Sequence, residues 1–328
     1  MSKPKVFVTI PLDERMVGRL SALCEVSHWS GDGRCPADVL ERELSDSRAL
    51  LGYAPVSAAL MDRAPLLRVI ATSSVGYDHI DVQAATERGI LVTHTPDVLT
   101  DTTADLAFTL MLAVARRIGE AERLTRAGRW GKGVDSSNLL GRDVHHATLG
   151  IIGLGRIGAA VAERAIGFKM KVLYHDFVRR EDLEKKFGYR YVDLETLLRE
   201  ADFVSIHVPL LPETRGMIGA AQLAMMKPTA YLINAARGPI VDESALIAAL
   251  REGKIAGAGL DVFEREPVDP ENPLLKMENV VVLPHVGSAT IATRRAMADL
   301  AAENVIAVME GRAPLTPVNP EVLPRLRA

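Results

Sequence analysis

Residues of catalytic type follow three apolar runs in the second half of the chain. Arg237 comes shortly after the first run, Glu266 after the second, and His285 after the third. Short apolar runs are typical of buried parallel strands, and the carboxyl ends of parallel strands meet at one edge of a sheet, where ligands bind. We therefore expect an arginine, an acid and a histidine to converge at such an edge.

These three side chains together suit the reduction of a ketone by hydride. As hydride reaches the carbon, negative charge develops on the oxygen, which the planar guanidinium of Arg237 can stabilise and a protonated His285 can neutralise. A nearby Glu266 would stabilise the charged imidazole. Arg237 and His285 also have purely structural explanations, because a strand-end arginine often forms a surface ion pair and a histidine can cap a helix.

A glycine-rich turn precedes these residues. The strand-like run 149–152 leads into Gly153, Gly155 and Gly158, and a helix-compatible segment follows at once. Gly153 would permit a tight turn, Gly155 would let the backbone approach a pyrophosphate, and Gly158 would let the helix pack closely on the strand. Because amides at the start of a helix can receive phosphate, the pattern predicts a dinucleotide-binding site.

Asp176 indicates which dinucleotide this site prefers. It follows the next strand-like run, 21 residues after Gly155, near the spacing of a ribose-binding carboxylate. A carboxylate that accepts both ribose hydroxyls would repel a 2′-phosphate, so NAD(H) is favoured. Arg179 and Arg180 lie close behind and could pair with a 2′-phosphate, so the use of NADP(H) remains open.

Strand-like runs alternate with helix-period segments along the chain, which predicts an α/β protein with parallel sheets. One helix is expected from about residue 102 and a final helix over 289–311, followed by a proline-rich tail. The glycine-containing stretch 128–141 is expected to lie outside the cores. The strand-like runs are 6–10, 49–52, 68–72, 90–93, 149–152, 171–175, 203–207, 230–234, 257–262 and 280–283.

The composition is that of a globular protein and excludes several other classes. Its 328 residues suggest about two domains, with 48% apolar and 25% charged residues. A net charge of −3 provides no field that would attract nucleic acid or a membrane surface. No signal peptide or membrane span is expected, and no metal site. Because Cys24 and Cys35 are too few to frame the fold, we expect free thiols and a cytoplasmic protein.

Five sequence segments carry a resemblance to a known family. They are 74–81, 149–158, 234–243, 259–267 and 284–290. In this order they resemble the D-isomer-specific 2-hydroxyacid dehydrogenase family, most closely its glyoxylate/hydroxypyruvate reductase branch. The resemblance implies an α/β fold of two doubly wound parallel-sheet, Rossmann-like domains. It further implies a discontinuous, flavodoxin-like substrate domain of residues 1–100 and 287–328, and an NAD(P)-binding Rossmann domain of residues 101–286.

The resemblance also implies an activity and a catalytic group. The activity is NAD(P)H-dependent reduction of glyoxylate or hydroxypyruvate to glycolate or D-glycerate. Arg237 would bind the substrate, His285 would donate the proton, and Glu266 would tune His285. A small 2-oxo or 2-hydroxy acid is thus the expected partner, together with a second copy of the chain in a homodimer formed through the cofactor domains.

Other residues match the family's substrate positions. The backbone amides of Val75 and Gly76 would receive the substrate carboxylate, since a glycine-containing turn can bind an anion. Ser288 matches a residue near the substrate. Tyr53 lies in a loop whose family counterpart touches substrate, although a tyrosine there could instead pack under the loop.

A larger set matches the family's cofactor contacts. Within it, Asp261 would hold the nicotinamide amide. The set consists of Thr103, Gly153, Leu154, Gly155, Arg156, Ile157, Gly158, Asp176, Arg179, Pro209, Ala235, Asp261 and Gly287.

Departures from the family pattern leave the substrate open. Mammalian glyoxylate/hydroxypyruvate reductases place a tryptophan of the partner subunit over the substrate, whereas this chain has Gly133 there and Trp130 nearby. Other members of the family act on D-lactate, D-3-phosphoglycerate or phosphite, and related corepressors use the same fold as dinucleotide-sensing scaffolds. Formate dehydrogenases are disfavoured, because they have a glutamine where Glu266 stands.

Overall fold

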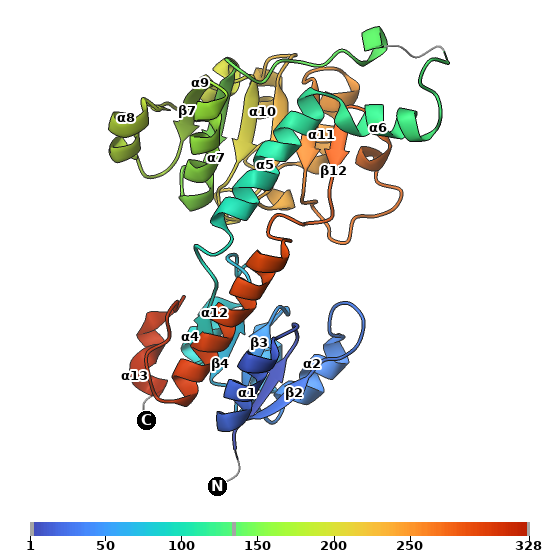
Figure 1. The fold of residues 1–328 in the computed structure, drawn as a ribbon. Coiled ribbons are helices and arrows are strands. Elements are labelled where there is room, and N and C mark those ends of the chain that lie inside the picture. The colour runs from blue at the N-terminus through green and yellow to red at the C-terminus, as the bar shows by residue number, and fades with distance from the viewer. Residues whose placement is uncertain (1–2, 133–135, 327–328) are drawn as a thin grey trace. The chain divides into compact units, whose positions relative to one another are not determined.

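The computed structural model describes residues 3–132 and 136–326, which form two compact α/β units. The first unit contains Met1–Leu99 and Ser288–Ala328, and the second contains Thr100–Gly287 (Figure 1). Each unit has one parallel sheet with helices on both faces, so the predicted fold class is confirmed. The assignment of substrate and cofactor roles to the two units remains a prediction.

The sheet of the second unit has the strand order of a doubly wound dinucleotide-binding fold. The order is β12-β11-β10-β9-β6-β7-β8, so the chain starts in the middle, runs to one edge and then returns to build the other half. The direction of winding reverses between β6 and β9, where such folds bind ligands. The strands are β6 (Thr148–Ile152), β7 (Lys171–His175), β8 (Arg190–Tyr191), β9 (Phe203–Ile206), β10 (Tyr231–Asn234), β11 (Gly257–Leu260) and β12 (Val280–Val282).

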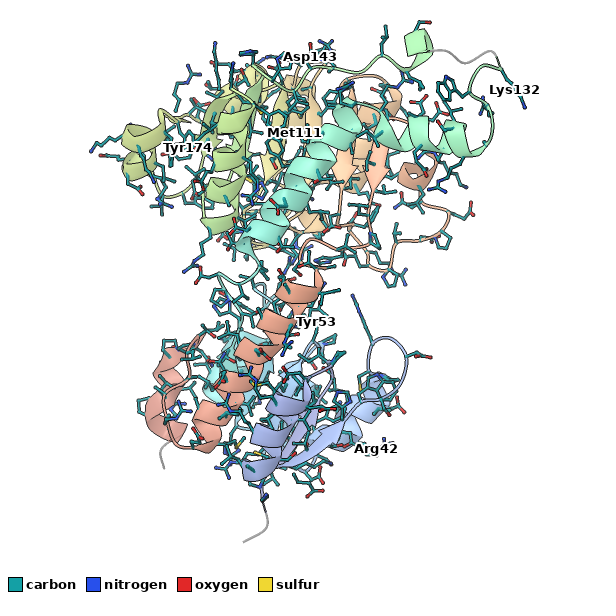
Figure 2. All side chains as sticks on the ribbon, in the orientation of Figure 1. Arg42, Tyr53, Met111, Lys132, Asp143 and Tyr174 are labelled. Carbon is teal, nitrogen blue, oxygen red and sulfur yellow. The ribbon has the colours of Figure 1, made fainter. Side chains whose placement is uncertain are left out.

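Two hydrophobic clusters cover the faces of this sheet. Side chains alternate along a strand, so Leu149 and Ile151 of β6 belong to one cluster and Ile152 to the other. On the first face, the buried Met111 lies on α5 (Thr100–Ala115), which packs beside α7 (Arg156–Gly167) (Figure 2). The opposite face carries α9 (Leu194–Glu200), α10 (Ala220–Met225) and α11 (Glu243–Arg251).

Short elements connect and flank this sheet. They are α6 (Ile118–Arg126), α8 (Glu181–Phe187), and the 3-10 helices η1 (Ser136–Leu139), η2 (Gly238–Ile240) and η3 (Pro273–Lys276).

The first unit contains a five-stranded parallel sheet in the flavodoxin-like order β2-β1-β3-β4-β5. Helices α1 (Glu14–Leu23) and α12 (Ile291–Met309) cover one face. The other face carries α2 (Ala37–Leu44), α3 (Ala58–Asp62) and α4 (Val82–Glu87). The strands are β1 (Lys5–Val8), β2 (Glu25–His28), β3 (Ser47–Gly52), β4 (Val69–Thr72) and β5 (Leu91–Thr93).

The C-terminal tail closes the β5 edge of this sheet. The N–H of Val318 donates to the carbonyl of Val92 at 2.8 Å. The buried amide of Asn319 accepts from the N–H of Val92 at 2.7 Å and donates to the carbonyl of Ile90 at 3.0 Å. The edge strand therefore has few unpaired backbone groups. The short helices η4 (Pro320–Val322) and α13 (Leu323–Leu326) follow.

A second buried amide ties this tail to α12. The side-chain oxygen of Asn304, which is fully buried, accepts from the N–H of Leu315 at 2.8 Å and of Thr316 at 3.1 Å. The hydroxyl of Thr316 in turn donates to the carbonyl of His94 at 2.5 Å. Both stretches of the first unit are thus connected by buried hydrogen bonds, which are costly to leave unmade.

Two strands were absent from the sequence expectations. β2 and β8 are edge strands with one partner each, and their exposed or half-exposed side chains do not give an apolar run. The final helix begins at Ile291 rather than residue 289, because Thr290 caps it. Cys24 and Cys35 are free, and no helix in the described ranges is long and apolar enough to cross a membrane.

Candidate active site

The predicted catalytic residues converge at the carboxyl edge of the second sheet. Strands β10, β11 and β12 are neighbours and run parallel. Arg237 follows β10, Glu266 lies in the loop after β11, and His285 follows β12. The register of three adjacent strands therefore brings together side chains that are 48 residues apart in sequence.

A buried asparagine and a glycine position the arginine. Asn234, 1% exposed, accepts from the N–H of Ala236 at 3.0 Å and donates to the carbonyl of Arg237 at 2.9 Å. A Cβ on Gly238 would lie 1.8 Å from the carbonyl oxygen of Phe263, so only glycine fits there. The backbone after Arg237 thus packs directly on the loop that carries Glu266.

His285 and Glu266 form a hydrogen-bonded pair. The Nδ1 of His285 lies 2.7 Å from Oε2 of Glu266, whose other oxygen accepts from the N–H of Phe263 at 3.2 Å. Burial acts to raise the pKa of Glu266, but the hydrogen bond and charge of His285 outweigh it and hold that pKa below its usual value. Glu266 is therefore ionised near neutral pH, Nδ1 is the donor, and Nε2 is the nitrogen left to face a substrate.

Asp261 fixes the turn that carries His285. Its two carboxylate oxygens accept from the N–H groups of Val286 at 2.7 Å and Gly287 at 2.8 Å, and its carbonyl accepts from the N–H of His285 at 2.8 Å. His285 has a φ of +55°, which a residue with a Cβ rarely adopts. Burial raises the pKa of Asp261, with the two N–H donors acting in the opposite direction. Thr103 packs on Gly287, so Thr103, Asp261 and Gly287 come together.

The glycine-rich turn has the geometry needed for dinucleotide phosphates. Gly153 has a φ of +93°, and a Cβ on Gly158 would lie 2.0 Å from the Gly153 carbonyl oxygen. A Cβ on Gly155 would meet no described atom within 4 Å, so no packing contact requires glycine there. The residue that caps α7 is Gly155, which makes no side-chain cap hydrogen bond, and the start of such a helix suits an anion. These residues fit a nicotinamide dinucleotide.

Asp176 lies beside this turn, and the two arginines that follow it are paired with acidic residues of α8. The Asp176 carboxylate accepts from the N–H of Leu154 at 2.6 Å and of Val178 at 3.1 Å. Arg179 makes two hydrogen bonds to Glu184, at 2.9 and 2.8 Å. Arg180 makes two to Asp182, at 3.0 and 2.9 Å.

A residue of the sheet, Tyr174, also donates a hydrogen bond to Glu184, the partner of Arg179. Hydrogen bonds from Arg179 and from the hydroxyl of Tyr174, which lies on β7 facing α8 (Figure 2), lower the pKa of Glu184 to about 2. Glu184 is therefore a carboxylate throughout the neutral range. Arg179 would have to leave this carboxylate to bind a 2′-phosphate.

The remaining cofactor candidates lie at the same edge. Leu154, Arg156 and Ile157 belong to the turn and first helical residues after β6. Pro209 follows β9, where its carbonyl accepts from Thr214 at 2.6 Å, and Ala235 follows β10.

The expected substrate residues other than Arg237 and His285 belong to the first unit. Tyr53, labelled in Figure 2, follows β3 directly and is 36% exposed. Its ring centroid lies 4.3 Å from that of His79. Val75 lies in a bend shortly after β4 and Gly76 follows it; we call this pair of residues the Val75–Gly76 turn. Ser288 begins the second stretch of this unit. Gly133 lies outside the described residues.

Comparisons with known proteins place the chain in a family. The profile of "D-isomer specific 2-hydroxyacid dehydrogenase, NAD binding domain" matches residues 108–287. A protein of Korarchaeum cryptofilum named glyoxylate reductase is 52% identical over 98% of this chain and 97% of its own length. The chain belongs to the D-isomer specific 2-hydroxyacid dehydrogenase family. This dehydrogenase is therefore an oxidoreductase that uses a nicotinamide dinucleotide.

Solved structures are similar along nearly the whole chain. A protein of Thermus thermophilus has a TM-score of 0.88 at 46% identity, covering 96% of the dehydrogenase and 99% of that chain. An NADPH-dependent glyoxylate/hydroxypyruvate reductase of Sinorhizobium meliloti, in complex with NADP and malonate, has a TM-score of 0.84 at 38% identity and covers 97% of each chain. The predicted family and fold are confirmed, while the roles of individual residues remain predictions.

A histidine that the sequence expectations did not single out lies at the point where the winding of the sheet reverses. His207 follows β9, and its Nε2 lies 2.8 Å from the hydroxyl of Ser205. The residue is half-buried, and desolvation of the imidazole lowers its pKa to about 4, so it is neutral at physiological pH. A polar residue ending an apolar run was the signal that could have identified it.

We expect the two glycines of α7 to respond in opposite ways to alanine. Gly158→Ala should lower the free energy of unfolding by about 2 kcal/mol and weaken NADH binding, because the new Cβ collides with the Gly153 carbonyl. Gly167→Ala, in open space, should leave stability unchanged or raise it by up to ~1 kcal/mol. Urea denaturation and NADH fluorescence titration measure both effects. Equal responses would contradict the close packing inferred for Gly158.

Proposed function

We propose that this dehydrogenase reduces glyoxylate and hydroxypyruvate to glycolate and D-glycerate, with NADH as the preferred cofactor. The observation that carries the proposal is the His285–Glu266 pair, 2.7 Å apart, beside Arg237 at the ligand-binding edge of a dinucleotide-type sheet. Support comes also from relatives named glyoxylate reductase, among them the Korarchaeum cryptofilum protein.

Each catalytic side chain has one task in this proposal. The guanidinium of Arg237 binds the substrate and stabilises the negative charge that develops on its keto oxygen. His285 donates the proton from Nε2 to that oxygen, while the ionised Glu266 holds the charged imidazole through Nδ1. When bound, the nicotinamide dinucleotide supplies the hydride. In the reverse direction, the neutral Nε2 accepts the hydroxyl proton.

The chain's other candidates bind and orient. The amides of Val75 and Gly76 receive the substrate carboxylate, with Tyr53 and Ser288 beside it. Amides of the glycine-rich turn hold the dinucleotide phosphates. Asp176 accepts the ribose hydroxyls. The other cofactor residues are Thr103, Arg179, Pro209, Ala235, Asp261 and Gly287.

We also propose a homodimer formed through the second unit. Helix α6 is amphipathic yet has no buried residue in the single chain. Ile118, Trp130 and Leu140 are 52%, 79% and 74% exposed. Exposed apolar side chains gathered along one segment are typical of a surface that another chain covers.

A substrate panel tests the function. With NADH, kcat/KM should be highest for glyoxylate or hydroxypyruvate, ahead of pyruvate and 3-phosphohydroxypyruvate, with no phosphite oxidation. Arg237→Lys should lower kcat/KM by about 30- to 1000-fold, because the charge stays but the planar fork is lost, while NADH binding is unchanged. Exposed Arg251→Lys is the matched control. Preference for another acid, or no turnover at all, would overturn the proposal.

Asp176→Ser tests the cofactor preference. The wild type should have a higher kcat/KM with NADH than with NADPH, because the carboxylate repels the 2′-phosphate. Removing that charge should narrow or reverse the ratio, by about tenfold for each ~1.4 kcal/mol of repulsion removed. A wild-type preference of tenfold or more for NADPH would refute this assignment and direct attention to Arg179 and Arg180.

Glu266→Gln tests the tuning of the proton donor. Glu266 lies 2.7 Å from Nδ1 of His285, and an ionised carboxylate at this distance stabilises a charged imidazole. Reduction requires the charged form, so kcat/KM for reduction should fall as the pH rises. In the variant this fall should begin at a lower pH than in the wild type. Oxidation requires the neutral form and should lose less at moderate pH. Profiles in both directions, with a deuteride isotope effect to show that chemistry is rate-limiting, measure the shift.

Exposed Glu264→Gln serves as the control for this experiment, since its side chain lies two residues away in the same loop. Its pH profiles should match those of the wild type. Superimposable profiles for wild type and Glu266→Gln would mean that Glu266 does not tune His285.

A further inference from the structure

We propose that His94 and a His79–Thr72–Ser74 relay are positioning residues that hold the Val75–Gly76 turn in the shape required to bind the substrate carboxylate. They act by donating hydrogen bonds, directly or through the relay, to carbonyl oxygens of the turn. This inference rests on the proposed function, in which the amides of Val75 and Gly76 receive that carboxylate. All of these residues belong to the first unit.

Two carbonyl groups fix the directions of the two binding amides. The Ser74 carbonyl accepts from the N–H of Thr95 at 2.9 Å, and the Val75 carbonyl lies 2.9 Å from Nδ1 of His94. In a trans peptide the C=O and N–H groups point in opposite directions. The two carbonyl oxygens point toward the segment after β5, to which they are hydrogen-bonded. The N–H groups of Val75 and Gly76 therefore point away from that segment.

The third carbonyl is held by a chain of side chains. The hydroxyl of Ser74 donates to the carbonyl of Gly76 at 2.6 Å. It lies 2.9 Å from the hydroxyl of Thr72, which lies 3.2 Å from Nε2 of His79. Because a hydroxyl has one proton, Ser74 must accept from Thr72, and Thr72 must accept from His79.

This count of donors assigns a proton to one nitrogen of each histidine. His79 must carry a hydrogen on Nε2, because the proton of Thr72 is already donated to Ser74. His94 must carry one on Nδ1, because the Val75 carbonyl can only accept. The ring geometry alone does not show which nitrogen of each histidine carries a proton. The acceptors that the two rings face in this turn make that assignment.

The two histidine rings are themselves held in place. The ring of His79 packs on Tyr53 with centroids 4.3 Å apart, and the rings of His94 and Tyr77 form a T-shaped pair with centroids 5.6 Å apart. The backbone of His94 is bonded on both sides to Thr316, by its N–H at 3.2 Å and its carbonyl at 2.5 Å. The two histidine donors are therefore held in place by contacts other than those to the turn. If the turn changed shape, its hydrogen bonds to these donors would be lost.

Such an arrangement favours anion binding in two ways. Amides that already point at the anion need no reorganisation when it arrives. A peptide group whose carbonyl accepts a hydrogen bond is also polarised, which makes its N–H a stronger donor. Loss of one positioning bond should thus weaken binding of the carboxylate in ground state and transition state alike, which raises KM rather than lowering kcat.

Paired substitutions test the kinetic consequence. His94→Leu and Thr72→Val should each raise KM for glyoxylate and the inhibition constant of oxalate by about tenfold, with kcat changed by less than about twofold. His94→Asn, whose amide N–H can replace the Nδ1 donor, and Thr72→Ser, which keeps the hydroxyl, should restore most of the loss. Unchanged oxalate inhibition in both His94→Leu and Thr72→Val would overturn the proposal.

Thr93→Val is the matched control. Thr93 is fully buried on the strand next to Thr72, but its hydroxyl has no hydrogen-bond partner among the described residues. The same loss of a buried hydroxyl should therefore leave oxalate inhibition unchanged. An equal effect at Thr93 and Thr72 would show that burial alone is responsible and would also overturn the proposal.

The protons can be observed without any ligand or turnover. In wild-type protein labelled with ¹⁵N-histidine, NMR at about pH 8.5, two units above the usual imidazole pKa, should find a proton on Nδ1 of His94 and on Nε2 of His79. Signals are assigned by their loss in His94→Asn and His79→Asn. A missing proton at either nitrogen would refute the inference. Absence of glyoxylate reduction by the wild type would instead refute the proposed function and leave this measurement to judge the turn.

Discussion

The buried carboxylate of Asp261 determines the position of residues 285–287, which include the proposed proton donor His285. It accepts from two successive N–H groups, and its own carbonyl accepts from a third, so residues 285–287 have a single arrangement. That arrangement holds His285 in a left-handed backbone conformation, which needs such support. The pairing of His285 with Glu266, and the direction of Nε2, follow from it. Burying a carboxylate is costly, and the charge-assisted hydrogen bonds offset that cost.

Local sequence patterns predicted every strand except the edge strands β2 and β8. The segments of β6 and β10 are fully buried apolar runs apart from their end residues, which is the pattern of a strand covered on both faces. The edge strand β2 has no buried residue, so the same rule gives no signal. The sequence placed Asn234 at the end of a strand. It did not indicate that the side-chain amide of Asn234 would hold the backbone around Arg237. The direction of a side-chain hydrogen bond depends on neighbours that only the folded sheet supplies.

The turn at Val75 shows a limit of another kind. The family resemblance implied an anion site at this turn, and its glycine agrees with one, yet nothing in the local sequence connects the turn with His94, 19 residues later. The contact exists because β4 and β5 are parallel neighbours whose carboxyl ends lie together. The roles of Arg237, Glu266 and His285 came from family resemblance as much as from chemistry, while residues that act through backbone carbonyls leave no motif to recognise.

The pairing of β5 with the C-terminal tail affects the order in which the two units fold while the chain is synthesised on the ribosome. Val92 bonds to Asn319 across 227 residues, and the whole second unit is synthesised between the two. The first unit therefore emerges with an open sheet edge and without α12, which later covers one face of its core. During that interval its apolar face and unpaired strand are exposed to neighbouring nascent chains. The second unit is one continuous stretch of the chain and can finish folding first. The first unit, although its synthesis begins earlier, is completed last.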